Sequence, residues 1–168
     1  MTTIWTEDQI TLNNLAQHFE DCGKRNVSVC DERINVYTDT WLAMAVHIDE
    51  GRKFLGIGSY LPIDKSRPRI ELLEFIQRLN NELFLASFSI DQDGDISIGV
   101  AVCYEHGLII AQFMIVLNRF GSMIGHIIDK LNEDGLIVFD SDGDDDKAGN
   151  SDDSSTTHGS RPKGVLLN

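Results

Sequence analysis

The chain opens with apolar residues that recur at helical spacing. Thr6 can cap this helix, Gln9 stands at the reciprocal position of a capping box, and Trp5 and Ile10 can pack together across the cap. Gly23 supplies the stop. The apolar stripe consists of Leu12, Leu15, Ala16, Phe19 and Cys22. We therefore expect a first helix that covers a core.

The next segments have the composition and spacing of β-strands. They are residues 27–30, 33–37, 41–48 and 54–61. Turn residues separate them, at Asp31-Glu32, Asp39-Thr40 and Asp49-Glu50-Gly51. This spacing predicts an antiparallel meander. Gly56 and Gly58 in the last strand indicate either a bulge or close approach, or a small residue beside a bulky neighbour.

A second helix follows a polar connection bracketed by Pro62 and Pro68 and runs to about Leu83. Asn80 lies at the margin of its apolar face, where an amide more often satisfies a backbone group than binds a ligand. The predicted apolar face is Leu72, Leu73, Ile76, Leu79 and Leu83.

The clearest hairpin joins residues 84–90 to residues 96–102 through Asp91-Gln92-Asp93-Gly94. Apolar residues occupy alternate positions in both segments, so we expect both inner faces to point into the core. These residues are Phe84, Ala86, Phe88, Ile90, Ile96, Ile98, Val100 and Val102.

The third helix, residues 107–132, has an apolar arc wider than one sheet requires. Its main stripe is Ile109, Phe113, Val116, Leu117, Phe120, Ile124, Ile127 and Leu131. A second set lies about 100° further round the helix: Ile110, Met114, Gly121 and Ile128. These four residues form the predicted interface with a partner, most simply another copy of the chain; the alternative is that they are ordinary core.

Gly121 and Gly125 fit either a close helix approach or a local kink. The hydrophobic segment 108–128 is long enough to span a bilayer. Arg119 would then lie near the middle of the membrane at a cost of several kcal/mol, so we do not expect a transmembrane helix.

Beyond residue 139 the composition changes to Asp, Ser, Gly and Thr. We therefore expect one α+β domain over residues 1–139 and an acidic, disordered tail over residues 140–168. The full chain has 168 residues and a net charge of −13. This charge repels phosphate backbones and anionic lipids, so neither nucleic acid nor a membrane surface is an expected partner.

No set of residues has the pattern of a catalytic site. Cys22, Cys30 and Cys103 are dispersed and are expected to be reduced, packed thiols. Asp91 to Asp95 departs from a calcium loop at its glycine and at its last ligand, so a tight turn is favoured. A thiolate pair of Cys103 with His106 lacks an orienting third group. We therefore predict no catalytic residues, no metal site and no cofactor.

Two segments carry a resemblance to a known family. They are residues 67–80, which read RPRIELLEFIQRLN, and residues 88–96, which read FSIDQDGDI. Together with the long apolar helix after them, they resemble the YbjN family, bacterial proteins described as sensory transduction regulators. The resemblance runs over roughly residues 6–134. The element order also looks like that of type III secretion chaperones, small acidic cytosolic homodimers.

The resemblance implies a single α+β domain in which helices pack on a curved antiparallel sheet, with no catalytic centre. It further implies recognition of another polypeptide by apolar grooves and sheet edges. The N-terminus, with Glu7 and Asp8, lacks the pattern of a secretory signal, so a cytoplasmic location is expected. The predicted function is a homodimeric, non-enzymatic, chaperone-like or regulatory protein-interaction module. The alternative is a dedicated secretion-type chaperone or partner subunit of one cognate protein.

Overall fold

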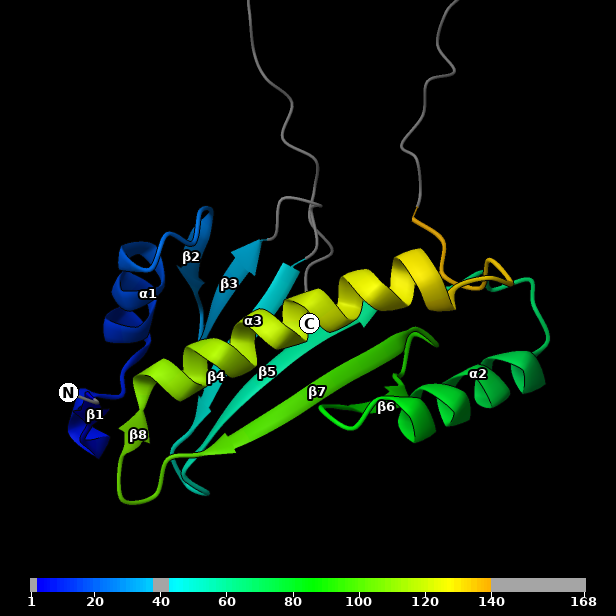
Figure 1. The fold of residues 1–168 in the computed structure, drawn as a ribbon. Helices are drawn as coiled ribbons and strands as arrows, with labels where there is room; N and C mark the ends of the chain where they lie inside the picture. The colour runs from blue at the N-terminus through cyan, green and yellow to red at the C-terminus, as the bar shows by residue number, and fades with distance from the viewer. Residues whose placement is uncertain (1–2, 38–42, 140–168) are drawn as a thin grey trace, which may run out of the picture.

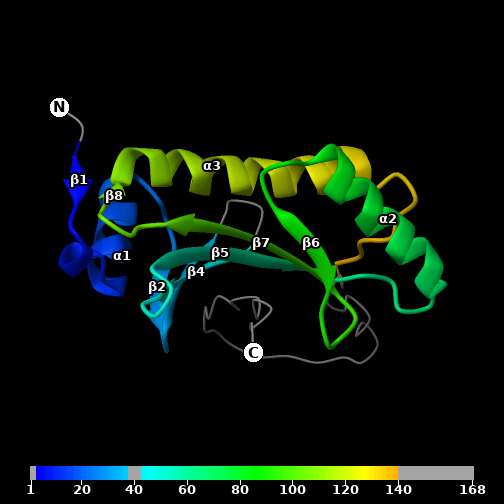
Figure 2. The same ribbon diagram turned by 90° about the horizontal axis from the view of Figure 1, so that it is seen from below.

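The computed structural model describes residues 3–37 and 43–139. Three helices lie on one side of a six-stranded antiparallel sheet (Figures 1 and 2). Helix α3 (Ile110–His126) runs across the sheet, with α1 (Leu12–Asp21) near its beginning and α2 (Arg69–Glu82) near its end. The main-sheet strands are β2 (Val27–Cys30), β3 (Arg33–Tyr37), β4 (Ala43–Asp49), β5 (Phe54–Leu61), β6 (Ser87–Ile90) and β7 (Ile96–Cys103).

The strand order in the sheet is β2-β3-β4-β5-β7-β6. The first four strands form the predicted antiparallel meander. Strand β7 then pairs with β5 along its whole length, from Phe54 opposite Cys103 to Leu61 opposite Ile96. Because β6 pairs only with β7, the sheet has β2 and β6 as its two edges.

The core lies between the helices and one face of the sheet. Leu15 and Phe19 of α1 and Phe113 and Phe120 of α3 are completely buried, and the rings of Phe19 and Phe113 stack with centroids 6.2 Å apart. From the sheet, alternate residues point to the same core, as the period of a strand requires. These include Ile34, Val36, Val46, Leu55, Ile57, Leu61, Ile96 and Ile98.

On the opposite face of the sheet, β5 carries the glycines noted in the sequence. The imidazole of His47, on β4, occupies the space where a Cβ of Gly56 would stand. The pairing of β5 with β7 is continuous through both Gly56 and Gly58, so the strand has no bulge there. A small residue beside a bulky neighbour is therefore the correct interpretation of Gly56.

The beginning of the chain differs from the single helix predicted. The capping box of Thr6 and Gln9 is confirmed, with the Thr6 N–H donating to Gln9 Oε1 at 2.9 Å, but it closes only a 3₁₀ turn, η1 (Glu7–Gln9). Helix α1 begins after a second cap, where Thr11 Oγ1 accepts from the Asn14 N–H at 3.2 Å. Gly23 ends the helix at φ +83°, as predicted.

The third helix begins later than predicted, because residues before it form a strand. Strand β8 (Leu108–Ile109) pairs with β1 (Ile4–Trp5) in a separate two-stranded sheet. The α-helical part then ends at His126, and a π-helical segment, η2 (Ile127–Leu131), follows shortly after Gly125. Within the described ranges, no helix has the length and apolar character needed to cross a membrane.

Two predictions fall on residues outside the described part of the chain. The strand predicted over residues 41–48 is seen as Ala43–Asp49, with its first two predicted residues and the turn before it outside the described ranges. The acidic tail over residues 140–168 also lies outside them. The domain boundary at residue 139 and the disorder of the tail therefore stay predictions.

Candidate functional site

The edge formed by β6 is capped by a side chain at Phe88. Asn80 Oδ1 accepts a hydrogen bond from the Phe88 N–H at 3.0 Å, and its amide nitrogen donates to the Phe88 carbonyl, also at 3.0 Å. The same amide donates to the Ile76 carbonyl of α2 at 3.1 Å. Asn80 thus replaces a neighbouring strand at Phe88, and the expectation that it satisfies a backbone group is confirmed.

The edge strand β2, which packs beside α1, has outward-facing main-chain groups along its middle that make no hydrogen bond to another described residue. The Tyr37 N–H donates to the carbonyl of Asn26, so these two opposite residues form a hydrogen-bonded pair. Such pairs alternate along an antiparallel ladder, and Val27 and Val29 therefore direct their N–H and C=O groups away from β3. None of the hydrogen bonds between described residues reaches those groups, and 44% of Val29 is exposed.

The turn between β6 and β7 uses Asp side chains to bind the backbone. Asp91 Oδ1 accepts from the Asp95 N–H at 2.8 Å, and Gly94 takes φ +84°. Asp95 in turn accepts from the Ile63 N–H at 3.2 Å and from the Lys65 ammonium. The predicted turn chemistry is confirmed, and the turn is tied to the segment before α2.

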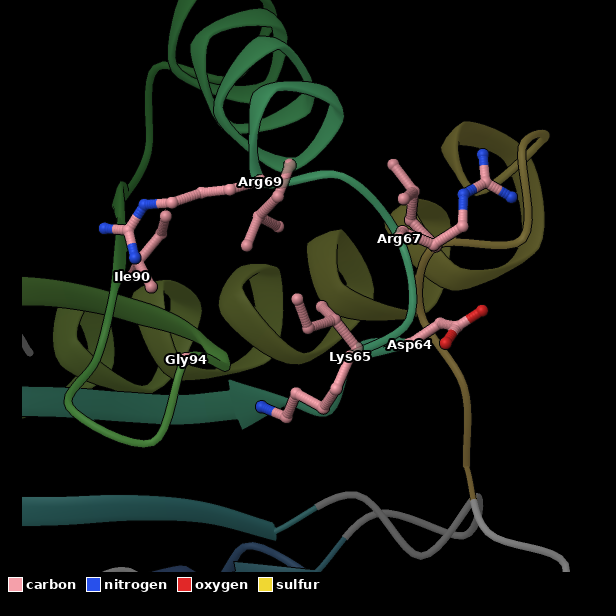
Figure 3. A pocket seen from close by; sticks show the side chains of 9 residues that line it. Asp64, Lys65, Arg67, Arg69, Ile90 and Gly94 are labelled. Atoms are coloured by element: carbon pink, nitrogen blue, oxygen red, sulfur yellow. The ribbon is translucent and has the colours of Figure 1, made fainter.

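A shallow cavity of about 140 Å³ lies between this turn and the beginning of α2. Figure 3 shows Lys65 and Arg69 extending toward the hairpin, while Asp64 and Arg67 point the other way. The Lys65 ammonium pairs with Asp95, and Arg67 pairs with Glu71 at 2.6 Å. Arg69, which also lines the cavity, has no ion pair among the described residues. The cavity lies where α2 meets the hairpin.

An exposed ion pair ties the N-terminal segment to the turn between β4 and β5. The Lys53 ammonium lies 3.0 Å from Glu7 Oε2, and the His106 N–H donates to the same carboxylate. The hydrogen bond and charge of Lys53 lower the pKa of Glu7, and Glu7 correspondingly raises the pKa of Lys53. Burial raises the pKa of Tyr104, whose ring centroid lies 6.0 Å from the same ammonium.

The prediction that the cysteines are packed is wrong, because all three are exposed. Cys22 lies at the end of α1, outside the apolar stripe, with its sulfur 3.4 Å from His18 Nε2. The His18 ring meets the edge of Trp5 at 5.3 Å. No hydrogen bond joins Cys103 to His106 in the described structure. Among the described residues, no group of His, Cys, Asp and Glu is placed to hold a metal ion.

The four residues predicted as an interface on α3 do not share one environment. Ile110 and Met114 are buried in the core of this chain, whereas Gly121 and Ile128 are half-buried. The solvent side of α3 instead presents Ile115, which is 51% exposed. The wide apolar arc is therefore explained in part by burial within one chain, and the interface on α3 stays a prediction that rests on Gly121 and Ile128.

The two most exposed large apolar residues, Phe84 and Ile70, lie beside and on α2, where no exposed apolar residue was predicted. Leu73 was assigned to the buried face but is 44% exposed, and Ile70 is 60% exposed. Phe84 was assigned to the inner face of the hairpin but precedes β6 and is 97% exposed. A sequence signal was present for Ile70, which at 100° per residue lies about 120–160° round the helix from Leu72 and Ile76. Leu73, three residues before Ile76, lies at the margin of the buried face.

Comparison with known proteins agrees with this architecture. The sequence matches the family model "YbjN: Putative bacterial sensory transduction regulator" over residues 28–133, more than half of the chain. The chain belongs to the YbjN family. No curated protein matches the sequence. The resemblance identified from residues 67–80 and 88–96 is thereby confirmed.

Solved structures show the same fold in YbjN and in a chain of one protein complex. The crystal structure of YbjN from E. coli, described as "a putative transcription regulator", matches at 14% identity and TM-score 0.62, covering 76% of this chain and 95% of that one. A chain of the ExsC–ExsE complex matches at 15% identity and TM-score 0.50, covering 73% and 90%.

A chain of the HopA1–SchA chaperone–effector complex has 16% identity, TM-score 0.47 and coverage of 62% and 81%. At these identities the two better matches show a shared fold alone. The predicted α+β class is confirmed: an antiparallel sheet is packed by helices in the predicted order.

Proposed function

We propose that this YbjN-family protein binds an extended segment of another polypeptide along β2. It would act as a chaperone-like or regulatory module in the cytoplasm, without catalytic activity of its own. The observation that carries the proposal is the difference between the two sheet edges. Asn80 occupies the main chain of β6 at Phe88, whereas Val27 and Val29 of β2 present their main-chain groups outward.

An open sheet edge is suited to this task because its unpaired N–H and C=O groups can form a ladder with any extended chain. Main-chain hydrogen bonds then supply affinity, and side-chain contacts supply selectivity. On β2 the selecting residue is Val29, which is exposed beside its outward-facing N–H. A valine favours an apolar residue at the facing position of the bound strand.

A narrower form of the proposal is a dedicated partner of one cognate protein. The ExsC–ExsE structure, which has a similar fold, is an assembly of two named proteins, and this favours the narrower form. The two forms differ in what the protein retains. A dedicated partner retains one polypeptide in a fixed ratio, whereas a general module retains many polypeptides weakly.

The proposal is tested by capture from native lysate with the full chain, the Val29→Pro variant and an Ile115→Glu control. Proline is tolerated on an edge strand where its N–H would face solvent, so Val29→Pro removes one outward donor and leaves the β2–β3 ladder intact. Ile115 is exposed to a similar extent on α3, away from this edge. We expect the amount of retained polypeptide to fall roughly tenfold with Val29→Pro, because about one hydrogen bond between uncharged groups is lost. The amount retained by Ile115→Glu should be unchanged.

Equal retention by the native chain and the Val29→Pro variant would contradict binding at β2. Circular dichroism of both variants confirms that each keeps its fold. The identity of the retained polypeptides, one or many, decides between the narrower and the broader form.

A further inference from the structure

The tail beyond the described residues contains one apolar segment. Residues 140–160 are mainly Asp, Ser, Gly and Thr, whereas residues 161–167 read RPKGVLL. This segment has two cations, no acidic residue and three consecutive large apolar residues, in a chain with 27 acidic and 14 basic residues. Its composition fits a surface that combines exposed apolar side chains with carboxylates.

The edge strand β2 presents such a surface. Val27 and Val29 direct their main-chain groups away from β3. Their side chains lie on the helix-covered face of the sheet, because they pair with the buried Val36 and Ile34 of β3. Just after β2, the carboxylate of Asp31 takes part in no ion pair between described residues. Apolar side chains and a carboxylate therefore follow one another along one short edge.

We infer that residues 163–167 add to β2 of the same chain as an antiparallel strand, with Val165 opposite Val29 and Leu167 opposite Val27. Opposite residues of an antiparallel pair project to the same face of the sheet. Val165 therefore covers Val29, which is 44% exposed, and Leu167 covers the half-buried Val27. The outward main-chain groups of both valines gain hydrogen-bonding partners.

Charge selects the antiparallel direction. In this register Lys163 lies beside Asp31, the carboxylate at the end of β2. A parallel strand would instead place Lys163 beside the start of β2, next to Lys24 and Arg25. Like charges would then meet, whereas the antiparallel strand brings opposite charges together.

The other residues of the segment suit the outer side of the new strand. Because main-chain groups alternate in direction along a ladder, those of Pro162, Gly164 and Leu166 face away from β2. Proline has no N–H to donate and is tolerated at such an outward position. Pro162 also hinders the addition of a further strand to the new edge. The side chain of Leu166 projects to the open face of the sheet, beside Ser28.

The linker is long enough to reach β2. The Val138 N–H donates to the Pro62 carbonyl, just beyond the end of β5. Strand β2 lies three strands from β5, which is about 14 Å, and a few residues of offset along the strands add a similar distance. About 25 residues separate Phe139 from Val165, and a disordered chain of that length, as the sequence predicts, spans about 25–30 Å. A linker that matches the separation gives the highest effective concentration.

The segment therefore competes with a partner polypeptide for β2. This consequence rests on the proposed function, whereas the contact itself does not. A partner that binds more tightly displaces the segment and protects the same main-chain groups further. Weakly binding chains do not displace it, so the tail limits which polypeptides reach the edge.

Amide hydrogen exchange of the full chain without a partner, measured by NMR, tests the contact. Val165→Ser and Leu166→Ser form a matched pair, because both replace an apolar residue with serine and only Val165 lies opposite Val29. We expect Val165→Ser to raise the exchange rates of the Val27 and Val29 amides several-fold, since the loss of one buried apolar side chain weakens the contact roughly tenfold. Leu166→Ser should leave both rates unchanged, and the Ser28 amide, which faces β3, is the internal reference.

The concentration of the chain identifies the source of the segment. A contact within one chain gives the same exchange rates at every concentration, whereas a segment from a second copy protects β2 more as the concentration rises. Rates that depend on concentration, equal rates in the native chain and Val165→Ser, or an equal effect of Leu166→Ser would each overturn the inference.

Capture from lysate separates this inference from the proposed function. We expect Val165→Ser to retain more polypeptide than the native chain, because the competing segment is weakened. Faster exchange in Val165→Ser together with undiminished capture by Val29→Pro would refute the proposed function and support the contact.

Discussion

At the scale of single residues, Asn80 distinguishes the two edges of the sheet by capping β6 at Phe88. Its amide makes two hydrogen bonds to Phe88 and one to Ile76, so it holds β6 to α2 while capping the edge at Phe88. The sequence placed Asn80 correctly at the margin of the helix, because helical spacing locates a residue on a face. Its partner could not be predicted, since Phe88 is brought to it by the turn between the helix and the strand.

Asn80→Ala should lower the free energy of unfolding by roughly 1–3 kcal/mol, because it leaves the Phe88 N–H and C=O without partners. Asn118→Ala, which makes the same change at an exposed position of α3, should have an effect within about 0.5 kcal/mol. Urea unfolding of both variants at one protein concentration measures the difference. Equal effects of the two substitutions would show that the clamp contributes nothing to stability.

At the scale of elements, the residue pattern within a segment predicted whether it forms a helix or a strand better than it predicted where that element begins and ends. The capping box predicted at Thr6 and Gln9 is present, yet it is followed only by a 3₁₀ turn, and the α-helix begins after a second cap at Thr11. Alternation also extended the hairpin back to Phe84, although pairing with β7 begins only at Ser87. The spacing of apolar residues shows which face of a helix or strand is buried. Where the helix or strand ends depends instead on the segment that lies beside its last residues.

The link between η1 and the turn before β5 gives these elements a pH dependence. Because Lys53 lowers the pKa of Glu7 in the folded chain, the unfolded chain binds more protons in acid, and the contribution of the pair is lost as the pH falls through that lowered pKa. The raised pKa of Lys53 makes the same contribution disappear in strong alkali.

Glu7→Gln should therefore be less stable than the native chain at pH 7, and the difference should disappear as the pH falls below the lowered pKa of Glu7. Unfolding in urea at a series of pH values measures this difference. Asp8→Asn serves as the control, because it removes a neighbouring carboxylate without touching Lys53. A difference that does not change with pH would mean that the ion pair is not the cause.

At the scale of the whole molecule, the order of helices and strands was predictable and the long-range pairings were not. Strand β1 pairs with β8 although Ile4 and Ile109 are more than a hundred positions apart, and two residues are too few to show a period. The exposure of Ile70 and Phe84 and the burial of Ile110 likewise depend on where neighbouring elements end. Which strands form the two edges also depends on the order of the strands in the assembled sheet.

The central claim, that β2 receives an extended polypeptide, is tested most directly by amide hydrogen exchange measured by NMR, residue by residue. The full chain is compared alone and with the polypeptide that it retains from lysate. We expect the Val27 and Val29 amides to become protected on binding, while the Ser28 amide, which already faces β3, changes little. Protection confined to α2 or α3, with Val27 and Val29 unchanged, would contradict the proposed site.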